Sequence, residues 1–494
     1  MTPKRIFLLI LTIVAIAAMG MDLITSWSQP QFQSRLELSQ TDLVLQASAF
    51  QGDQTTRKAL IDAKPEEAAL KTYQETLGKV DKAIATAEAQ LSKDTTGTFA
   101  NEVKKQELLK DELRLRIGIL QAQQKKPDEA LKTWETVSQN SKEVATAKVL
   151  SDLWRDAIPV AAEPTLTQNL DGWFETRSLE KLYTLQQRSD AIEQLKVTEQ
   201  QASQQALVRL AAINGLPAIA ILSGIGVLLF LIGQRLIKGK QSLLSGTNDI
   251  TWTVPWDGEI VWQVLVVGFF FVGQILIGQS LPVLVALARS ADLIDPTTWG
   301  AKEKAVLSLV TYLALATGGL SVLYGSIRSF LPLPSGWFRL SLKGNWWLWG
   351  LGGYVAAYPL IVAVSWVNNQ IWQGRGGSNP ILPIVLEGRD PIAFGIFLVT
   401  AAIAAPLFEE TFFRGFLLPS LTKYFSTWQA ILLSSVLFAV VHLSLSEVIP
   451  LTVLGTILAF VYTRTQNLMA SILLHALWNA GMLLTLFFLG GTST

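Results

Sequence analysis

Three motifs near the end of the chain place polar side chains among strongly apolar neighbours. The motifs are Glu409-Glu410 followed by Arg414, Phe438 followed by His442, and His475 followed by Asn479. A carboxylate beside a second carboxylate in a dry site is suited to act as a general base, and an imidazole and a carboxamide can be presented to the same point. Ionisable groups in apolar segments are costly and mark functional sites. These residues are therefore the candidate functional residues of the chain.

The spacing within the motifs assigns partners to some of these groups. Glu410 and Arg414 are four residues apart, so on a helix they share a face with the acid nearer the N-terminus, an order that favours an ion pair. Glu409 lies about 100° around the helix from Glu410 and needs a partner from another segment. His442 and His475 are the only histidines of the chain, and we expect one or both of them to be that partner.

The motifs belong to a chain with the composition of a membrane protein that carries a polar appendage. Half of the 494 residues are hydrophobic and 16% are charged. We expect an all-α polytopic transmembrane helix bundle of about nine spans, with an N-terminal extramembrane α-helical domain. After an N-terminal anchor, the predicted spans cover 210–233, 260–288, 305–327, 346–367, 391–418, 428–446, 448–463 and 468–489.

Four regions follow from this pattern. Residues 1–26 form a membrane anchor, although their end in small residues also permits a cleavable signal. Residues 27–208 form a soluble α-helical domain, in which Lys126–Trp134 resembles the second helix of a tetratricopeptide hairpin; an ordinary amphipathic hairpin is the simpler interpretation. Residues 209–345 add further transmembrane helices, and residues 346–490 form the core that carries the motifs.

The basic residues predict the orientation of the spans, because loops rich in Lys and Arg face the cytoplasm. In the predicted topology these residues gather at one end: Lys4, Arg5, Arg235, Lys238, Lys240, Arg328, Arg339, Lys343, Arg414, Lys423 and Arg464. We therefore expect a cytoplasmic N-terminus, with 27–208 and the C-terminus on the opposite side. This arrangement and the lack of cysteine suit a bacterial plasma membrane or a thylakoid.

The depth of the motif residues in the membrane and the composition of the chain limit the possible chemistry further. At about 1.5 Å per residue, Glu409, His442 and His475 fall within one band of depth on the cytoplasmic side. His475 and Asn479 share a helix face and can address one point. The chain has no cysteine, which excludes thiol nucleophiles and disulfides, and its net charge of +1 gives no reason to expect nucleic acid as a partner.

In this order on successive membrane helices, Glu-Glu-x-x-x-Arg, Phe-x-x-x-His and His-x-x-x-Asn resemble a known family. This is the CAAX-protease and bacteriocin-processing family of intramembrane glutamate endopeptidases, also called the Abi family, whose eukaryotic members include the Ras-converting endopeptidase or CAAX prenyl protease 2. The resemblance covers about 346–490, most tightly 391–485. The preceding residues lie outside it.

The resemblance implies a role for each motif residue. Glu409 would activate the attacking water, which His442 would help to hold or polarise. His475 and Asn479 would stabilise the oxyanion of the tetrahedral intermediate. The residues with supporting roles would be Glu410 and Arg414, as a structural ion pair near the site, and Phe438.

Metal dependence stays open at this stage. Glu409, His442 and His475 match the ligand set of a catalytic zinc site. The zincin signature His-Glu-x-x-His is absent, and the resemblance favours a metal-free water. We therefore expect no cofactor, with zinc as the alternative.

The expected function is an intramembrane endopeptidase that cuts a membrane-associated or C-terminal peptide, with the lipid bilayer as its surroundings. The 27–208 domain is a candidate for binding a protein partner. A catalytically silent membrane scaffold, which recruits partners through that domain, is the alternative. A transporter is a third option because buried carboxylates can relay protons, but the sequence shows no inverted repeat.

Overall fold

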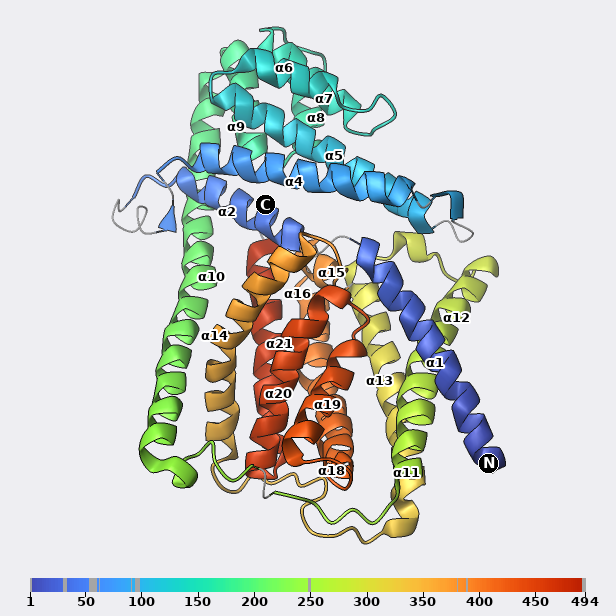
Figure 1. The fold of residues 1–494 in the computed structure, drawn as a ribbon. Coiled ribbons are helices and arrows are strands. Elements are labelled where there is room, and N and C mark those ends of the chain that lie inside the picture. Colours follow the sequence, from blue (N-terminus) through green and yellow to red (C-terminus); the bar gives the residue numbers. More distant parts are fainter. Residues whose placement is uncertain are drawn as a thin grey trace. The chain divides into compact units, whose positions relative to one another are not determined.

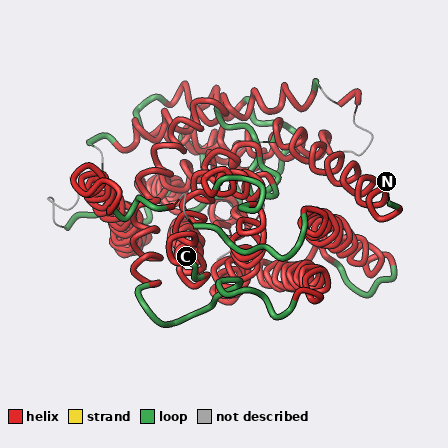
Figure 2. Tube along the Cα trace, turned by 60° about the horizontal axis from the view of Figure 1, so that its bottom comes forward, coloured by secondary structure: helices red, strands yellow, loops and turns green. Residues whose placement is uncertain are grey.

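The structure is a computed structural model that describes residues 2–29, 33–52, 60–61, 63–89, 91–93, 98–247, 250–379, 381–387 and 390–490. In these residues every regular element is a helix and none is a β-strand (Figure 2), so the all-α prediction is confirmed. The chain divides into two units. The membrane unit joins Met1–Trp27 to Pro217–Phe487, and the helical unit joins Ser28–Leu216 to Phe488–Thr494.

The helical unit is built from amphipathic helices around a core of its own. The helices are α2 (Gln33–Ser48), α4 (Pro65–Glu88), η1 (Leu91–Lys93), α5 (Thr98–Gln123), α6 (Pro127–Glu135), α7 (Val144–Trp154), α8 (Ala162–Asn169), α9 (Gly172–Leu185) and the first part of α10 (Ser189–Lys238). Tyr73, Trp134 and Phe174 are buried in the core. α6 packs on α5 as a hairpin, because Gly118 leaves room for the Trp134 indole, whose Nε1 donates to the Leu115 carbonyl at 3.1 Å.

A charged network lies inside the helical unit, where three of its helices meet. Arg116 on α5 donates to Asp42 on α2 at 2.7 Å and to Asp171 at 3.1 Å. The Tyr73 hydroxyl on α4 also donates to Asp42. Burial raises the pKa of Asp42 to about 6, although the Arg116 charge acts in the opposite direction. The network therefore joins helices that are distant in sequence through a carboxylate that is costly to ionise.

The membrane unit contains the long apolar helices. The elements are α1 (Pro3–Ser28), the rest of α10, η2 (Gly239–Gln241), α11 (Gly258–Gln263), η4 (Val264–Ile277), α12 (Gly278–Ser290), η5 (Pro296–Thr298), α13 (Ala301–Ile327), η6 (Arg328–Phe330), α14 (Trp346–Trp372), α15 (Ile381–Glu387), α16 (Pro391–Val399), η7 (Thr400–Ala404), α17 (Ala405–Glu409), η8 (Glu410–Leu417), α18 (Leu418–Leu421), α19 (Thr427–Val440), η9 (Leu445–Glu447), α20 (Val448–Thr465) and α21 (Leu468–Gly490). Eight helices in the described part of the chain are long and apolar enough to cross a membrane. In Figure 1, α20 and α21 lie between α14 and α13, and α19 runs beside α20.

The predicted span at 428–446 is shorter in the structure and needs correction. Its helix, α19, begins after the Ser426 cap and ends at Val440, so it has 14 residues. A helix of this length does not reach across the hydrocarbon core of a bilayer, which takes about 20 residues. His442 consequently lies in the turn that follows α19 and not within a helix.

Tertiary contacts explain why α19 stops early. Leu443 adopts a left-handed backbone conformation with φ 57°, which turns the chain out of the helix. The hydroxyls of Ser444 and Ser446 then donate to the carbonyls of Gly376 and Gly377 at 3.2 and 2.7 Å. These serines bind a loop that comes after α14, and no local sequence signal predicts that contact.

Three contacts join connecting segments of the membrane unit, and each involves a basic residue. Arg5, at the start of α1, contacts Glu259 at the start of α11 at 2.7 Å. Lys423, after α18, donates to the Trp256 carbonyl at 2.5 Å. The Leu468 amide, at the start of α21, donates to the Arg339 carbonyl at 2.9 Å. These contacts join the start of α1 to the start of α11, the segment after α18 to the segment before α11, and the start of α21 to the segment after η6.

Candidate active site

The acidic motif lies where one long helix changes its winding. The segment from α16 to α18 is a continuous helix over Pro391–Leu421, and its parts η7 and η8 are π-helical. Glu409 is the last residue of α17 and Glu410 the first of η8. π-Helical turns inside α-helices are frequent at functional sites. The paired acids thus stand at a junction between two helical forms.

Glu410 and Arg414 form an ion pair inside the bundle. The Arg414 Nη1 lies 2.9 Å from the Glu410 Oε1, and the side chains are 1% and 0% exposed. The Arg414 Nη2 donates to the Gly455 carbonyl of α20 at 3.0 Å. Buried charges are tolerated when they are paired and hydrogen-bonded, and this pair meets both conditions. It fixes the acidic helix against α20.

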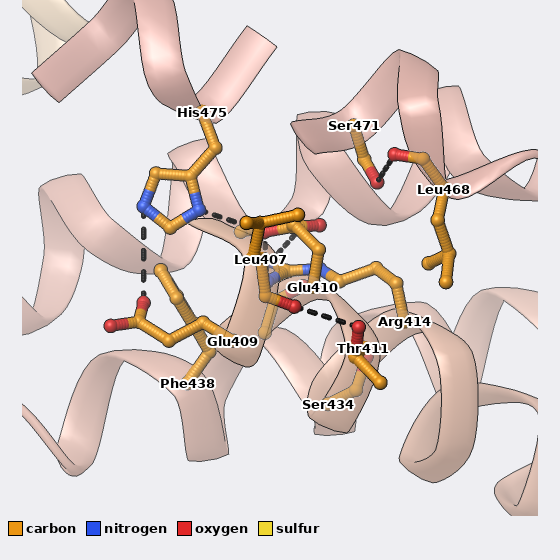
Figure 3. Close-up of polar contacts among 12 residues, drawn as sticks. Leu407, Glu409, Glu410, Thr411, Arg414, Ser434, Phe438, Leu468, Ser471 and His475 are labelled. Carbon is orange, nitrogen blue, oxygen red and sulfur yellow. Dashed lines mark hydrogen bonds and ion pairs between the residues drawn. The ribbon is translucent and has the colours of Figure 1, made fainter. Parts of the chain in front are cut away.

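The same Glu410 oxygen also holds His475, a contact that the spacing of the motifs does not predict. The His475 Nδ1 lies 2.9 Å from Glu410 Oε1, and the imidazole is 3% exposed. A carboxylate can only accept in such a bond, so Nδ1 carries the proton. The other ring nitrogen, Nε2, lies 3.8 Å from Glu409 Oε2. Figure 3 shows the His475 ring with one nitrogen directed at each acid.

Glu409 has its second partner on a helix outside the three motifs. The Tyr312 hydroxyl of α13 donates to Glu409 Oε1 at 2.8 Å. The other oxygen, Oε2, is buried and accepts no hydrogen bond from the described protein groups. The expectation that Glu409 needs a partner from another helix therefore leads to two residues, His475 and Tyr312. The sequence offered only one signal for Tyr312, a hydroxyl in the middle of an apolar span.

Phe438 lies at the centre of the site. Its ring is 1% exposed and lies 4.9 Å from the His442 ring and 5.7 Å from the His475 ring, centroid to centroid. The Arg414 guanidinium lies 4.5 Å from the same ring. The His442 Nδ1 is 2.7 Å from the Phe438 carbonyl. In the described residues, His442 thus reaches the cluster through Phe438 and not through a hydrogen bond to Glu409.

Asn479 lies one turn beyond His475 on α21, as the spacing predicts. Its side-chain nitrogen donates to the Ala401 carbonyl in η7 at 2.7 Å. The carboxamide nitrogen carries two N–H groups, so one of them remains for another acceptor. Asn479 therefore ties α21 to the π-helical part of the acidic helix, next to the His475 turn.

The zinc alternative finds little support in this arrangement. Among the described residues, no three His, Asp or Glu side chains converge as a metal site would require. The His475 Nδ1 is bound to Glu410, and His442 is held by a backbone carbonyl. Glu409, His442 and His475 do not form a ligand set in this geometry, and we derive no step through a metal.

The fold and site define a polytopic α-helical membrane protein with a buried acid–imidazole cluster. Residues 391–481 match the model of the family described as "Type II CAAX prenyl endopeptidase Rce1-like". The chain is 31% identical over 136 residues to "UPF0177 protein YxdF" of Lactococcus lactis, a match that covers 27% of this chain and 73% of that protein. It is 28% identical over 135 residues to "Putative membrane peptidase YdiL" of Bacillus subtilis, covering 27% of this chain and 53% of that protein. No solved structure matches significantly.

The chain belongs to the CAAX-protease and bacteriocin-processing family, and it is an integral multi-pass membrane protein. The match spans about half the length of the Bacillus relative. The matched segment 391–481 contains every motif residue from Glu409 to Asn479, whereas Tyr312 precedes it.

Proposed function

We propose that the protein is an intramembrane endopeptidase in which Glu409 activates a water molecule to hydrolyse a peptide bond. The observation that carries this proposal is the 3.8 Å between Glu409 Oε2 and His475 Nε2. That distance is too long for a direct hydrogen bond but suits two groups that share one water, each at about 2.8 Å. Glu410 supports the arrangement because it fixes the His475 ring.

The proposed reaction gives each of these groups a step. The water gives a proton to Glu409 as its oxygen attacks the carbonyl carbon of the substrate, which forms a tetrahedral oxyanion. Asn479, and His475 when Nε2 is protonated, donate toward that oxyanion, while the family resemblance assigns to His442 the polarisation of the water. Glu409 then passes the proton to the leaving amine as the carbon–nitrogen bond breaks. Base catalysis typically contributes about 100- to 10,000-fold and an oxyanion donor about 100- to 1000-fold.

The test compares the new protein termini in cells that make the wild-type chain with those in cells that make Glu409→Gln. We expect a set of termini to vanish in Glu409→Gln, with normal amounts of protein in the membrane. The exposed Glu135 of the helical unit supplies the matched control Glu135→Gln, which keeps these termini. Identical termini in wild type and Glu409→Gln would refute the peptidase and favour the scaffold, in which the helical unit recruits a partner.

We also propose the membrane orientation, with the N-terminus in the cytoplasm and residues 27–208 on the opposite side. The support is the distribution of Lys and Arg among the predicted loops, of which Arg5 and Lys423 both contact the segment at the start of α11. Since the chain has no cysteine, single variants Lys240→Cys and Lys126→Cys report sidedness directly. An impermeant maleimide added outside intact cells should label the variant at 126 only. Labelling at 240 alone would reverse the orientation.

A further inference from the structure

Tyr312 is a half-buried polar contact of the site that lies outside the matched family segment. Its hydroxyl donates to Glu409 Oε1 at 2.8 Å, although the two residues are 97 positions apart. It is carried by α13, which precedes the matched residues 391–481. The preceding helices therefore do more than surround the site, since one of them places a hydrogen-bond donor on its central acid.

Close packing holds α13 against the acidic helix at this point. A side chain on Gly319 would put its Cβ 3.2 Å from the Phe408 ring, so glycine permits the approach. The Tyr312 ring packs edge to face with the same Phe408 ring, with 6.2 Å between centroids and planes at 81°. Phe408 directly precedes Glu409 in the chain. Tyr312 and the backbone that carries Glu409 are thus fixed relative to each other by a shared, buried ring.

The hydrogen bond from Tyr312 determines which carboxylate oxygen of Glu409 points toward His475. A carboxylate can turn about its terminal torsion, which has broad and nearly two-fold preferences. With Oε1 bound to Tyr312, Oε2 is the oxygen directed toward His475 Nε2. A general base must lie within hydrogen-bond reach of the proton that it abstracts, and small displacements lower the rate strongly. The Tyr312 hydroxyl therefore keeps Oε2 in the orientation that a general base at this site needs.

We propose that Tyr312 is a positioning residue, which holds the Glu409 carboxylate with Oε2 toward His475 and the water. This inference rests on the proposed endopeptidase function. It assigns to α13 a part of the reaction centre, and it implies that the matched segment alone does not complete the site. A purely structural tie between α13 and the acidic helix would explain the same distance, so the test must separate the two roles.

The experiment uses the full-length chain, purified in detergent, with Tyr312→Phe as the variant. Phenylalanine keeps the ring against Phe408 and removes only the hydroxyl. The substrate is a quenched fluorescent peptide that spans a cleavage site lost in Glu409→Gln cells. Tyr324→Phe on the same helix is the matched control, because Tyr324 is 62% exposed. Turnover, KM and the thermal unfolding midpoint are measured for each protein.

We expect Tyr312→Phe to lower kcat about 10- to 100-fold with KM changed by less than about twofold, because the variant misplaces the base and leaves the binding groups intact. The unfolding midpoint and the Tyr324→Phe kinetics should match those of the wild type. Wild-type kcat in Tyr312→Phe would overturn the inference, and so would a loss of kcat that a fall in the unfolding midpoint fully explains.

The outcomes also separate this inference from the proposed function. If Glu409→Gln is inactive and Tyr312→Phe is fully active, the peptidase stands and the role of Tyr312 is refuted. If Glu409→Gln cleaves as the wild type does, the peptidase mechanism itself fails and the role of Tyr312 fails with it.

Discussion

Glu410 Oε1 lies 2.9 Å from the Nδ1 of His475, and the same oxygen lies 2.9 Å from the Nη1 of Arg414. Glu410 is therefore more than the partner of a structural arginine. It links the helix that carries Glu409 to the helix that carries His475, and it directs the free nitrogen of His475 toward Glu409. Orientation of an imidazole by a second acid is a recurring way to fix its tautomer and its ring.

Glu410→Gln should impair both stability and activity. The amide leaves Arg414 buried without a counter-charge, which typically costs about 3–5 kcal/mol, and His475 loses its charged partner. Thermal unfolding followed by tryptophan fluorescence and peptide cleavage measure the two effects. The double variant Glu410→Leu with Arg414→Met removes both charges, so it should recover stability but not cleavage. Wild-type cleavage by the double variant would show that Glu410 does not position His475.

Phe438→Leu should lower the cleavage rate by about 10-fold while the protein still enters the membrane. Small displacements of the catalytic side chains lower the rate strongly. The phenylalanine ring contacts both imidazoles and lies 4.5 Å from the Arg414 guanidinium. Leucine fills part of the space but lacks the flat surface that both rings contact. Phe425→Leu is the control, since Phe425 is 44% exposed. Equal cleavage rates for Phe438→Leu and the wild type would count against this role of the ring.

The fold could be predicted from sequence to the extent that it rests on local apolar periodicity. Long apolar runs such as 346–367 became helices of membrane length. The end of α19 at Val440 could not be predicted, because it depends on hydroxyls of Ser444 and Ser446 that bind carbonyls almost 70 residues earlier in the chain. Apolar residues continue past Val440, so composition alone extends the span.

The contacts of the site could be predicted where both residues lie on one helix, because their spacing along the chain then determines whether they meet. The four-residue separation of Glu410 and Arg414 gives their ion pair directly. The bonds from Tyr312 to Glu409 and from His475 to Glu410 join residues 97 and 65 positions apart. Such contacts depend on which helix faces align in the bundle. No pattern along the chain encodes that alignment at the level of single side chains.

Gly319→Leu should reduce cleavage by at least about 10-fold, whereas Gly319→Ala should keep most of it, because displacement of the base grows with side-chain size. The Cβ of alanine would lie 3.2 Å from the Phe408 ring, which requires a shift of a few tenths of an ångström. Leucine requires a larger movement of Phe408 and of the adjacent Glu409. Gly325→Leu on the same helix meets open space and serves as control. Similar losses in Gly325→Leu and Gly319→Leu would point to a general effect on α13.

Asp42 should make the stability of the helical unit depend on pH. Its folded pKa of about 6 exceeds the ordinary value of 3.8, so the folded form binds this proton more tightly than the unfolded form does. The resulting stabilisation is complete below pH 4 and disappears as the pH rises through 6. A folded pKa that is roughly 2 above the unfolded pKa corresponds to about 3 kcal/mol of stabilisation at most. Hydrogen exchange on peptides of α4, corrected for the intrinsic effect of pH, should therefore show protection that falls from pH 4 to 6. Asp42→Asn should lose this slope because an amide does not titrate, whereas a slope unchanged in Asp42→Asn would assign the pH dependence to another group.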